Sequence, residues 1–588
     1  MEHDHLYRIR HSLAHILAMA LRKRDPGVML ATGPVTEDGF FYDVRFSEGV
    51  TVSPDDFQKI ESDMRGIIAR KLPFVRRIVT ADEARAIFGK NPFKMEIIAE
   101  LEKTGTEITV YETGDPGSES GTSFTDLCEG PHIGSTGEID PGSFTMKGIA
   151  GAYWHGDERN EMLVRISGIA FETKADLEKY LTMLEEAKKR DHKRLGVELD
   201  LFFIDEEVGK GLPMWTPKGT AIKFALEDMT RSLERRYGYD HVCTPYLGSE
   251  RLYKASGHLD HYKENMYAPI DMDGNLFYLR PMACPHHIRM LMRKPISYRD
   301  LPVRYAEIAD YNRYEKSGEL MGMIRLRKFQ LTDAHIFVAP EQLKEEFKSV
   351  CSLIREGMEK LGLADAVSYR FSKRDPKDMH KYYPDDELWE KAESVMKEAL
   401  DESGFSYTEA EGEAAFYGPK LDVQGRNVNG KEDTLFTAQI DFLLPEKFGL
   451  EYTDQHGAKK RPVMIHRSAI GALERTFAFL IEHYAGAFPF WLSPVQTRVI
   501  PISETERAYA KNILEKLRVT GIRADIDTSD ETLGKKIRNA KLEKIPYLLV
   551  IGKNEMANGT ATLESRDRGK IGEKTPEEIV ELFRKESE

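Results

Sequence analysis

The chain has 588 residues, of which 41% are hydrophobic and 31% charged, a balance typical of a soluble globular protein of about three or four domains. It has no run of about 18 apolar residues, and its N-terminus, MEHDHLYRIRHSLAH, lacks the apolar segment of a signal peptide, so we expect a cytoplasmic protein without a membrane span. The net charge of -14 argues against a nonspecific nucleic-acid coat but leaves room for a local basic patch.

The cysteines are too few and too widely spaced for a disulfide framework. We therefore expect them to be reduced thiols or metal ligands. The four are Cys128, Cys243, Cys284 and Cys351.

Residues 1–171 carry two pairs of metal-binding residue types at one spacing. His11 and His15 stand four residues apart in a predicted short amphipathic helix, so both imidazoles share one helical face. Cys128 and His132 repeat that spacing downstream. Each pair alone is more typical of ordinary packing, but together they favour a shared tetrahedral zinc site. Further polar side chains that could line its wall, or simply pack in strands, are Tyr42 and Lys94.

Residues 172–196 predict a linker helix, from about Thr173 to Leu195. Thr173 and Asp176 resemble a capping box, and a leucine stripe follows. Gly196 is a natural stop for such a helix.

Residues 197–489 mix strands and helices without a regular alternation, which predicts a mainly antiparallel sheet flanked by helices. The chain has no GxxxxGK[ST] loop. If it binds a nucleoside triphosphate, arginines and magnesium must hold the phosphates.

A β-hairpin with a long loop is predicted within this region, with strands over 303–311 and 321–330. Strand alternation should place Arg313 and Glu315 on one face, and Arg325 and Arg327 on one face across the loop. This arrangement indicates either a polyanion site or a solvated, salt-bridged hairpin, and the stretch alone does not decide between them.

Residues 490–588 alternate strand and helix, which predicts a small α/β domain. Its second helix, expected near 533–544, is crowded with basic side chains. They form either a solvated face or a surface that contacts RNA. They are Lys535, Lys536, Arg538, Lys541 and Lys544.

An ordered set of motifs spans nearly the whole chain and closely resembles the bacterial type of threonyl-tRNA synthetase, without the ubiquitin-like domain that usually precedes it. The motifs are HSLAH, DLCEGPH, RPMACPHH, RYEKSGEL, TDAHIF, FYGPKLDV, VMIHRSAIGALER and FPFWLSPVQ. The resemblance implies an α+β multidomain protein: an N-terminal α+β editing domain, a class II synthetase core built on an antiparallel sheet, and a C-terminal α/β anticodon-binding domain. It implies a homodimer that activates threonine with ATP, transfers it to the 3' end of tRNA(Thr) and hydrolyses mischarged seryl-tRNA(Thr).

The resemblance also assigns the nucleotide site to the predicted hairpin. Arg313 would hold the α-phosphate and the threonyl carboxylate, and Glu315 would accept from the adenine amino group. Arg325 would face the nucleotide, and Arg475 would grip the γ-phosphate. Fixed guanidiniums with Mg²⁺ offset the charge that builds up on the polyphosphate. Pro245 would close the motif at the dimer interface.

One zinc ion per chain is implied at Cys284, His335 and His466, a set that spacing alone does not reveal. From spacing, His286 and His287 would be the first choice because they adjoin Cys284. Three protein ligands leave zinc open to the amino and hydroxyl groups of threonine, so valine is rejected. The resemblance places further residues around the aminoacyl pocket: Met282, Asp333, Tyr417, Lys420 and Gln439.

Serine keeps the hydroxyl and lacks only a methyl group, a difference of roughly 1 to 3 kcal/mol in an apolar pocket, so a second, editing site is needed. Here the resemblance implies a metal-free hydrolytic site, although the residues alone favour zinc. His258 is implied as a proton relay in the transfer step. The editing set is His11, His15, Tyr42, Lys94, Asp126, Cys128 and His132.

The chain departs from the family pattern at two positions in these domains. Leu331 stands where a glutamine is usual in the aminoacyl pocket, and Glu564 where an arginine is expected on the anticodon-reading strand. Glu555 and the basic helix remain candidate RNA contacts. Two alternatives stay open: a non-catalytic paralogue that binds tRNA, and a synthetase for another amino acid.

Overall fold

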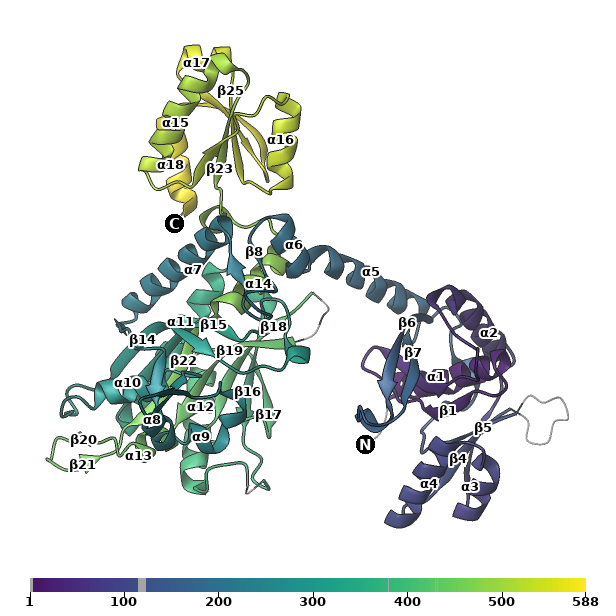
Figure 1. The fold of residues 1–588 in the computed structure, drawn as a ribbon. Helices are drawn as coiled ribbons and strands as arrows, with labels where there is room; N and C mark the ends of the chain where they lie inside the picture. The colour runs from purple at the N-terminus through teal and green to yellow at the C-terminus, as the bar shows by residue number, and fades with distance from the viewer. Residues whose placement is uncertain (1–3, 115–122, 379, 429, 431, 588) are drawn as a thin grey trace. The chain divides into compact units, whose positions relative to one another are not determined.

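The computed structural model describes residues 4–114, 123–378, 380–428, 430 and 432–587 (Figure 1). The chain divides into two compact units, Met1–Glu185 and Glu186–Glu588. Among the described helices, none is long and apolar enough to span a bilayer.

The first unit is organised around helix α1, His5–Arg24, whose side chains are buried almost continuously from Ile9 to Leu21. It is a 20-residue core helix, so the expectation of a short amphipathic helix is wrong. Asp4 caps its start by accepting a hydrogen bond from the backbone N–H of Tyr7 at 2.7 Å. The helix packs with α2 (Phe57–Ala69) on an antiparallel sheet of β1 (Met29–Thr32), β2 (Gly39–Arg45), β7 (Met162–Ala170) and β6 (Phe144–Tyr153).

A smaller antiparallel sheet in the same unit leads the chain to Cys128. Its strands are β3 (Phe74–Ile78), β4 (Thr109–Thr113) and β5 (Phe124–Leu127), and two helices accompany them, α3 (Ala81–Phe88) and α4 (Pro92–Thr104). Asn91 caps α4 by accepting from the N–H groups of Phe93 and Lys94. Because β5 ends at Leu127, Cys128 leaves the sheet at its edge.

The linker forms two helices, α5 (Lys174–Arg190) and α6 (His192–Glu198), so the prediction of one helix is wrong. Asp191 leaves the helical conformation and accepts from the N–H of Lys193 at 2.7 Å, which starts α6 anew. The predicted cap is present, because Thr173 Oγ1 accepts from the N–H of Asp176 at 3.2 Å. Gly196 lies inside α6 and does not end it.

An eight-stranded sheet carries most of the second unit, and it is antiparallel except at its two edge pairs. This confirms the predicted sheet. Its order is β10 (Asp240–His241), β14 (Val303–Asn312), β15 (Lys328–Val338), β22 (Val463–Ala472), β19 (Glu432–Asp441), β18 (Lys420–Arg426), β16 (Val367–Lys373) and β17 (Tyr407–Glu411). The helices that share its core are α7 (Pro217–Arg236), α11 (Leu343–Lys360), α12 (Asp386–Glu402) and α14 (Leu473–Tyr484) (Figure 1).

Shorter elements surround this sheet. A three-stranded sheet is built from β11 (Leu247–Ser249), β13 (Asn275–Leu279) and β12 (Ile270–Met272). The short helices are α8 (Glu250–Ala255), α9 (His258–His261), α10 (Cys284–Leu291) and α13 (Leu443–Lys447). Two-stranded pairs join β8 (Phe202–Phe203) to β9 (Met214–Trp215), and β20 (Tyr452–Thr453) to β21 (Lys459–Lys460).

The predicted hairpin exists as β14 and β15, paired in register from Val303 opposite Phe337 to Asn312 opposite Lys328. Its second strand begins at Lys328, so the expected start at 321 is wrong. Residues 321–327 instead form a loop, closed by the N–H of Met321 donating to the carbonyl of Arg325 at 3.2 Å. Arg313 and Glu315 lie beyond the end of β14, so strand alternation does not govern them.

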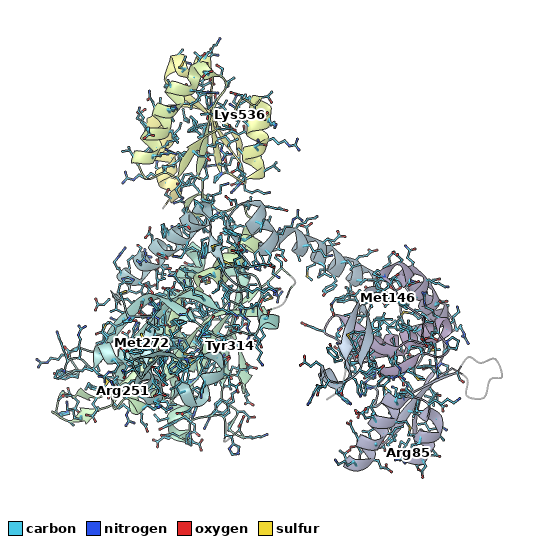
Figure 2. All side chains as sticks on the ribbon, viewed as in Figure 1. Arg85, Met146, Arg251, Met272, Tyr314 and Lys536 are labelled. Carbon is cyan, nitrogen blue, oxygen red and sulfur yellow. The ribbon has the colours of Figure 1, made fainter. Side chains whose placement is uncertain are left out.

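The C-terminal part forms the predicted α/β layer: β24 (Ala524–Ile526), β23 (Thr497–Pro501), β25 (Tyr547–Ile551), β26 (Ala561–Ser565) and β27 (Gly569–Lys574), with α15 (Arg507–Val519), α16 (Leu533–Leu542), α17 (Lys553–Asn558) and α18 (Pro576–Ser587). The basic side chains of α16 are less free to contact RNA than the sequence indicates. Lys536, labelled in Figure 2, is 4% exposed, and its Nζ donates to the carbonyl of Pro501 at 3.2 Å.

A buried ion pair ties α7 to β22. Arg467 Nη1 lies 2.7 Å from Glu234 Oε1, and both side chains are almost fully enclosed. Burial raises the pKa of Glu234, but Arg467 and His241 more than offset it and hold that pKa below its usual value. The Arg467 guanidinium also lies 4.0 Å from the ring centroid of Tyr239.

Replacing Glu234 with alanine should therefore destabilise the second unit strongly, by about 3 to 5 kcal/mol, because Arg467 is left charged and buried. Thermal melting followed by circular dichroism measures the effect. The matched control is Glu356→Ala, which removes the exposed partner of Arg236 and should cost about 0 to 1 kcal/mol. Equal shifts in Tm for the two variants would contradict the role given to the buried pair.

Candidate functional site

A cavity of about 280 Å³ opens over β15, β19 and β22, and it collects most of the predicted aminoacyl and nucleotide residues. Predicted site residues that line it are Met282, Cys284, Arg313, Asp333, His335, Tyr417, Gln439, His466 and Arg475. They come from segments up to about 190 residues apart in sequence, so the sheet, not local spacing, assembles the site.

Strand register accounts for the histidines of the predicted metal set. His335 on β15 pairs directly with His466 on β22, and their ring centroids are 4.8 Å apart. Cys284 enters from the first turn of α10. One ligand atom from each of the three side chains lies within 4.8 Å of the others. Two imidazoles and a thiol at this separation could hold a metal ion, and their chemistry suits zinc with open coordination positions.

The outer nitrogens of both histidines have fixed partners. His335 Nδ1 lies 2.8 Å from Nδ1 of His287, and His287 Nε2 lies 3.0 Å from Oε2 of Glu307. If the Nε2–H of neutral His287 donates a hydrogen bond to Glu307, then Nδ1 of His287 accepts one from Nδ1–H of His335. Nε2 of His335 is then unprotonated. His466 Nε2 lies 2.8 Å from Asp441 Oδ2, so its Nδ1 is the nitrogen left for a metal.

Burial controls the protonation of the metal set. It lowers the pKa of His335 well below its usual value, so the imidazole is neutral, as a metal ligand must be. Burial, with Asp333 and Asp441, raises the pKa of the Cys284 thiol well above its usual value. A thiolate at Cys284 therefore needs a cation beside it, and these residues fit one.

Polar groups on the cavity wall are held in place by hydrogen bonds. Tyr311 donates a short hydrogen bond to Asp333, and its oxygen accepts from the N–H of Ala283 at 3.0 Å. Tyr417 donates a short hydrogen bond to Gln439. Leu331 lies on the wall with Phe329 and makes this part of the cavity apolar.

The arginines gather at one end of the cavity. Burial lowers the pKa of Arg475, and the neighbouring charge of Arg313 lowers it further. Glu315 lies 2.8 Å from Arg325 and forms an ion pair with it, and neither lines the cavity among the described residues. Arg327 is structural, because its Nη1 donates to the carbonyl of Lys210 at 3.2 Å.

Two predicted catalytic residues stand just outside the described cavity lining. Lys420 forms an ion pair with Asp422 at 2.8 Å and lies opposite Gln439 in the sheet register. His258 Nε2 lies 3.4 Å from the sulfur of Met282, which does line the cavity. Burial lowers the pKa of His258 to about 4, so its imidazole is neutral at pH 7 and able to accept a proton.

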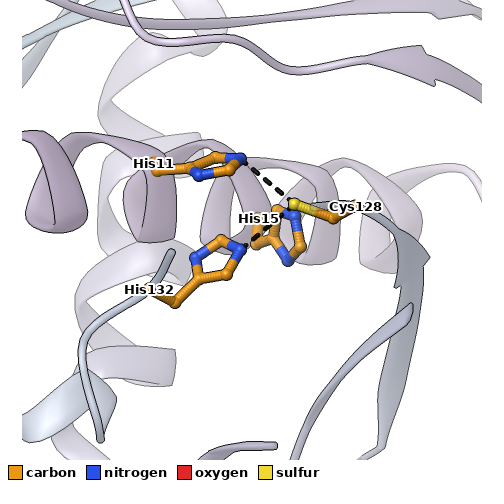
Figure 3. A group of neighbouring side chains, drawn as sticks. All are labelled: His11, His15, Cys128 and His132. Carbon is orange, nitrogen blue, oxygen red and sulfur yellow. Dashed lines mark hydrogen bonds between the residues drawn. The ribbon is translucent and has the colours of Figure 1, made fainter. Parts of the chain in front are cut away.

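The first unit brings its two predicted pairs together (Figure 3). His11 Nε2 lies 3.2 Å from the sulfur of Cys128, and His132 Nε2 lies 3.4 Å from it. The ring centroids of His11 and His15 are 5.7 Å apart, as expected for one helical face. Ligand atoms of all four side chains lie within 4.8 Å of one another.

Burial keeps His15, Cys128 and His132 of this cluster neutral. It lowers the pKa of His15 and His132 and raises the pKa of Cys128 to about 12. Ser12 lies beneath the cluster: its Oγ accepts from the N–H of Ile133 at 3.3 Å and lies 3.0 Å from Nδ1 of His132. A neutral imidazole beside a neutral thiol can accept a proton from water or bind a metal.

A buried polar chain adjoins the cluster. Asp126 accepts a short hydrogen bond from Tyr42, and Nζ of Lys94 lies 2.6 Å from its Oδ1. Asp126 Oδ2 lies 3.7 Å from Nε2 of His15. The structure thus brings together all seven side chains predicted for editing, with Lys94 supplied by helix α4.

Sequence reasoning missed several residues that support these sites: Ser12, His287, Glu307, Tyr311 and Asp441. His287 was considered only as a ligand. Ser12 carries a local signal, since it sits within HSLAH between the two histidines. Glu307 and Asp441 have no such local sequence signal, because the partner of a carboxylate on a strand is set by how the sheet folds.

The candidate RNA contacts in the C-terminal part are largely occupied. Lys535 pairs with Glu531 at 2.7 Å, and Lys541 pairs with Glu564 at 2.7 Å. Glu555 accepts from the N–H of Gly552 at 2.9 Å and caps α17. The basic face of α16 is therefore partly neutralised within the domain.

Three family models match the chain. Residues 267–484 match the tRNA synthetase class II core domain (G, H, P, S and T), residues 496–586 the anticodon binding domain, and residues 108–167 the threonyl and alanyl tRNA synthetase second additional domain. These matches confirm the predicted fold class. They cover the cavity, the C-terminal layer and the segment that carries Cys128 and His132.

Two solved structures share much of this fold. One is the RNA binding domain of threonyl-tRNA synthetase from Cryptosporidium parvum, with a TM-score of 0.63 and 37% identity, covering 67% of this chain and 98% of that one. The other is a putative threonyl-tRNA synthetase from Aeropyrum pernix, with a TM-score of 0.60 and 28% identity, covering 68% of this chain and 96% of that one.

Curated relatives extend the similarity over nearly the whole chain. Threonine--tRNA ligase of Geobacillus kaustophilus is 50% identical over 93% of this chain and 82% of its own length. Threonine--tRNA ligase 1 of Bacillus subtilis is 48% identical over 97% of this chain and 86% of its own length. Identity at this level over this length leaves one conclusion: the chain belongs to the threonine–tRNA ligase family of class II aminoacyl-tRNA synthetases.

Proposed function

We propose that the cavity over β15, β19 and β22 is where this chain activates threonine with ATP, and that the cluster of His11, His15, Cys128 and His132 in the first unit removes serine. The family reaction is the ATP-dependent joining of threonine to tRNA(Thr), with magnesium accompanying ATP. One observation carries the proposal for the second unit: Arg313, Arg475 and the Cys284, His335, His466 set line one cavity. We divide the chain into an editing domain (1–171), a linker (172–196), a catalytic domain (197–489) and an anticodon-binding domain (490–588).

In this proposal the nucleotide binds at the arginine end of the cavity. Arg313 holds the α-phosphate and the carboxylate that attacks it, and Arg475 holds the γ-phosphate. Arg325 and Glu315 now neutralise each other, so adenine binding at Glu315 would use the face of its carboxylate turned away from Arg325. Two fixed guanidiniums favour the charge of the transition state without reorganisation.

At the other end, Cys284, His335 and His466 would hold one zinc ion. Zinc bound there supplies a Lewis acid with positions open to the amino and hydroxyl groups of threonine. Asp333 orients the same groups, and its hydrogen bond from Tyr311 fixes the carboxylate. Valine lacks the hydroxyl, so its binding would leave a polar group of the site without a partner. Valine is therefore strongly rejected relative to threonine.

Tyr417, Gln439 and Met282 complete the aminoacyl wall in this proposal. Lys420 acts through Gln439, its neighbour across the sheet. His258, neutral near pH 7, would receive a proton as the ribose hydroxyl attacks the adenylate. Leu331 would contact the substrate methyl group, where an apolar wall favours threonine over serine.

We assign serine removal to the first unit. His11, His15, Cys128 and His132 would position water and the ester, and Lys94 would be held by Asp126 to face the developing oxyanion. A metal-free site is the version we propose, although the same donor set would suit zinc.

The assembly we propose is a homodimer that acts in the cytoplasm. Pro245 is exposed, and beside it Tyr246 is 58% exposed. Phe224 on α7 is 55% exposed. Exposed large apolar side chains near the predicted interface motif support burial against a second copy.

Amino-acid-dependent exchange of pyrophosphate into ATP tests the central proposal. With threonine, serine, valine and proline as substrates, exchange should be fastest with threonine and about 100-fold or more slower with valine. No exchange with any of them would refute ligase activity in this cavity. A preference for another amino acid would point to Leu331 as the cause of a changed specificity.

Metal analysis tests the zinc set. The purified protein should carry about one zinc per chain, and Cys284→Ala should lose it because one of three ligands is gone. Cys351→Ala is the matched control, since Cys351 is equally buried but lies in the core of the second unit. Zinc content that is unchanged in Cys284→Ala, or lost in both variants, would count against the assignment.

A double variant, His11→Ala with His15→Ala, tests the editing site. Seryl-tRNA(Thr) should accumulate in aminoacylation with serine, whereas threonine-dependent pyrophosphate exchange should persist, because the second unit is intact. His5→Ala on the same helix is exposed and serves as the control. Serine clearance as fast in the double variant as in the parent protein would argue that these histidines do not edit.

A further inference from the structure

The loop of residues 321–327, which we call the nucleotide loop, leads into β15 and carries Arg325, one of the residues proposed for ATP. Its tip is anchored inward: Met323 is 0% exposed and packs in the core of the second unit. The backbone N–H of Met323 donates to Nε2 of His192 at 3.2 Å, 131 residues away in sequence. His192 does not line the cavity among the described residues.

The hydrogen bonds of His192 define its protonation. A backbone N–H can only donate, so Nε2 must be an acceptor. The ring proton is then on Nδ1, which lies 2.7 Å from Oε1 of Glu482 on α14. The side chain is 2% exposed. A buried, neutral imidazole thus links the nucleotide loop to α14.

The same helix holds the loop a second time. Arg475, about two turns before Glu482 on α14, donates from Nε to the carbonyl of Ile324 at 3.2 Å. Two consecutive loop residues are therefore fixed to one helix, Met323 through His192 and Ile324 directly.

Gly322 fits this arrangement from the loop side. Its φ is +49°, and a Cβ there would lie 2.1 Å from Nε2 of His192. Only glycine allows the imidazole to come this close to the loop backbone.

We propose that His192 is a positioning residue for ATP: through Met323 it holds the nucleotide loop so that the Arg325–Glu315 pair and Arg475 keep one fixed spacing beside the nucleotide. The inference rests on the proposed function of the cavity. It concerns ATP only, because the threonine groups Asp333, Gln439 and His466 lie on β15, β19 and β22, whose register is set by the sheet.

Two near-isosteric substitutions separate the two hydrogen bonds of His192. Glutamine places a polar atom near the position of Nε2 and can keep the bond to Met323, whereas asparagine reaches only the position of Nδ1 and keeps Glu482. His192→Asn and His192→Ala should raise the KM for ATP about five- to tenfold, the effect of one lost hydrogen bond in a buried site, and His192→Gln about twofold or less. The KM for threonine should stay unchanged in all three variants.

Pyrophosphate exchange measures both KM values, and circular dichroism melting confirms that each variant is folded. Equal ATP effects in the asparagine and glutamine variants, parallel rises in both KM values, or no rise in His192→Ala would each overturn the inference. Loss of exchange in the parent protein would instead refute the proposed function, so the two failures are distinct.

Gly322→Ala supplies an independent approach if a His192 variant fails to fold, and an unchanged KM for ATP in Gly322→Ala alone would overturn the inference. This substitution should raise the KM for ATP in the parent protein because the new methyl group displaces the imidazole. In a His192→Gly background the ring is absent, so the same change should have a smaller effect on the KM for ATP. The two changes should be non-additive because residue 322 and the imidazole are in contact. Additive effects in the double-mutant cycle would overturn the inference.

Discussion

The buried pair of Arg467 and Glu234 sets the face on which chemistry can occur. Arg467 follows His466 on β22, so their side chains point to opposite faces of the sheet. With Arg467 held against α7 by Glu234 and Tyr239, His466 must face the cavity. A buried guanidinium without its carboxylate partner would cost several kcal/mol. An orientation of β22 that turns Arg467 away from Glu234 is therefore unfavourable.

The two histidine and cysteine sites use the same side chains in different surroundings. In the second unit, each histidine has its outer nitrogen committed, to His287 or to Asp441, so that one nitrogen remains for a ligand. In the first unit, His11 and His132 both turn a nitrogen toward the sulfur of Cys128. The histidines of the second unit therefore present free nitrogen lone pairs to a cation. Those of the first unit use their nitrogens in hydrogen bonds within the cluster. This contrast favours a metal in the second unit and hydrolysis without one in the first.

Sequence alone predicted the sheet type, the C-terminal layer and the pairing of His11 with His15, because periodicity and helical spacing are local. It did not predict where β15 begins, since the loop before Lys328 is held by distant groups such as His192. The break at Asp191 was missed because neither glycine nor proline marks it, and the first such signal is Gly196. The residues Cys284, His335 and His466 came from the family resemblance alone, and their meeting depends on strand register that no single segment encodes.

That register has a consequence for folding. His335 stands directly opposite His466, and a slip of one residue between β15 and β22 would send one of them to the other face of the sheet. A metal ion that binds these two side chains and Cys284 therefore stabilises only chains whose strands are aligned correctly, by mass action on the native state. The ligand set proposed to select threonine would then also select the correctly paired sheet, so that metal supply during synthesis would become a determinant of folding yield.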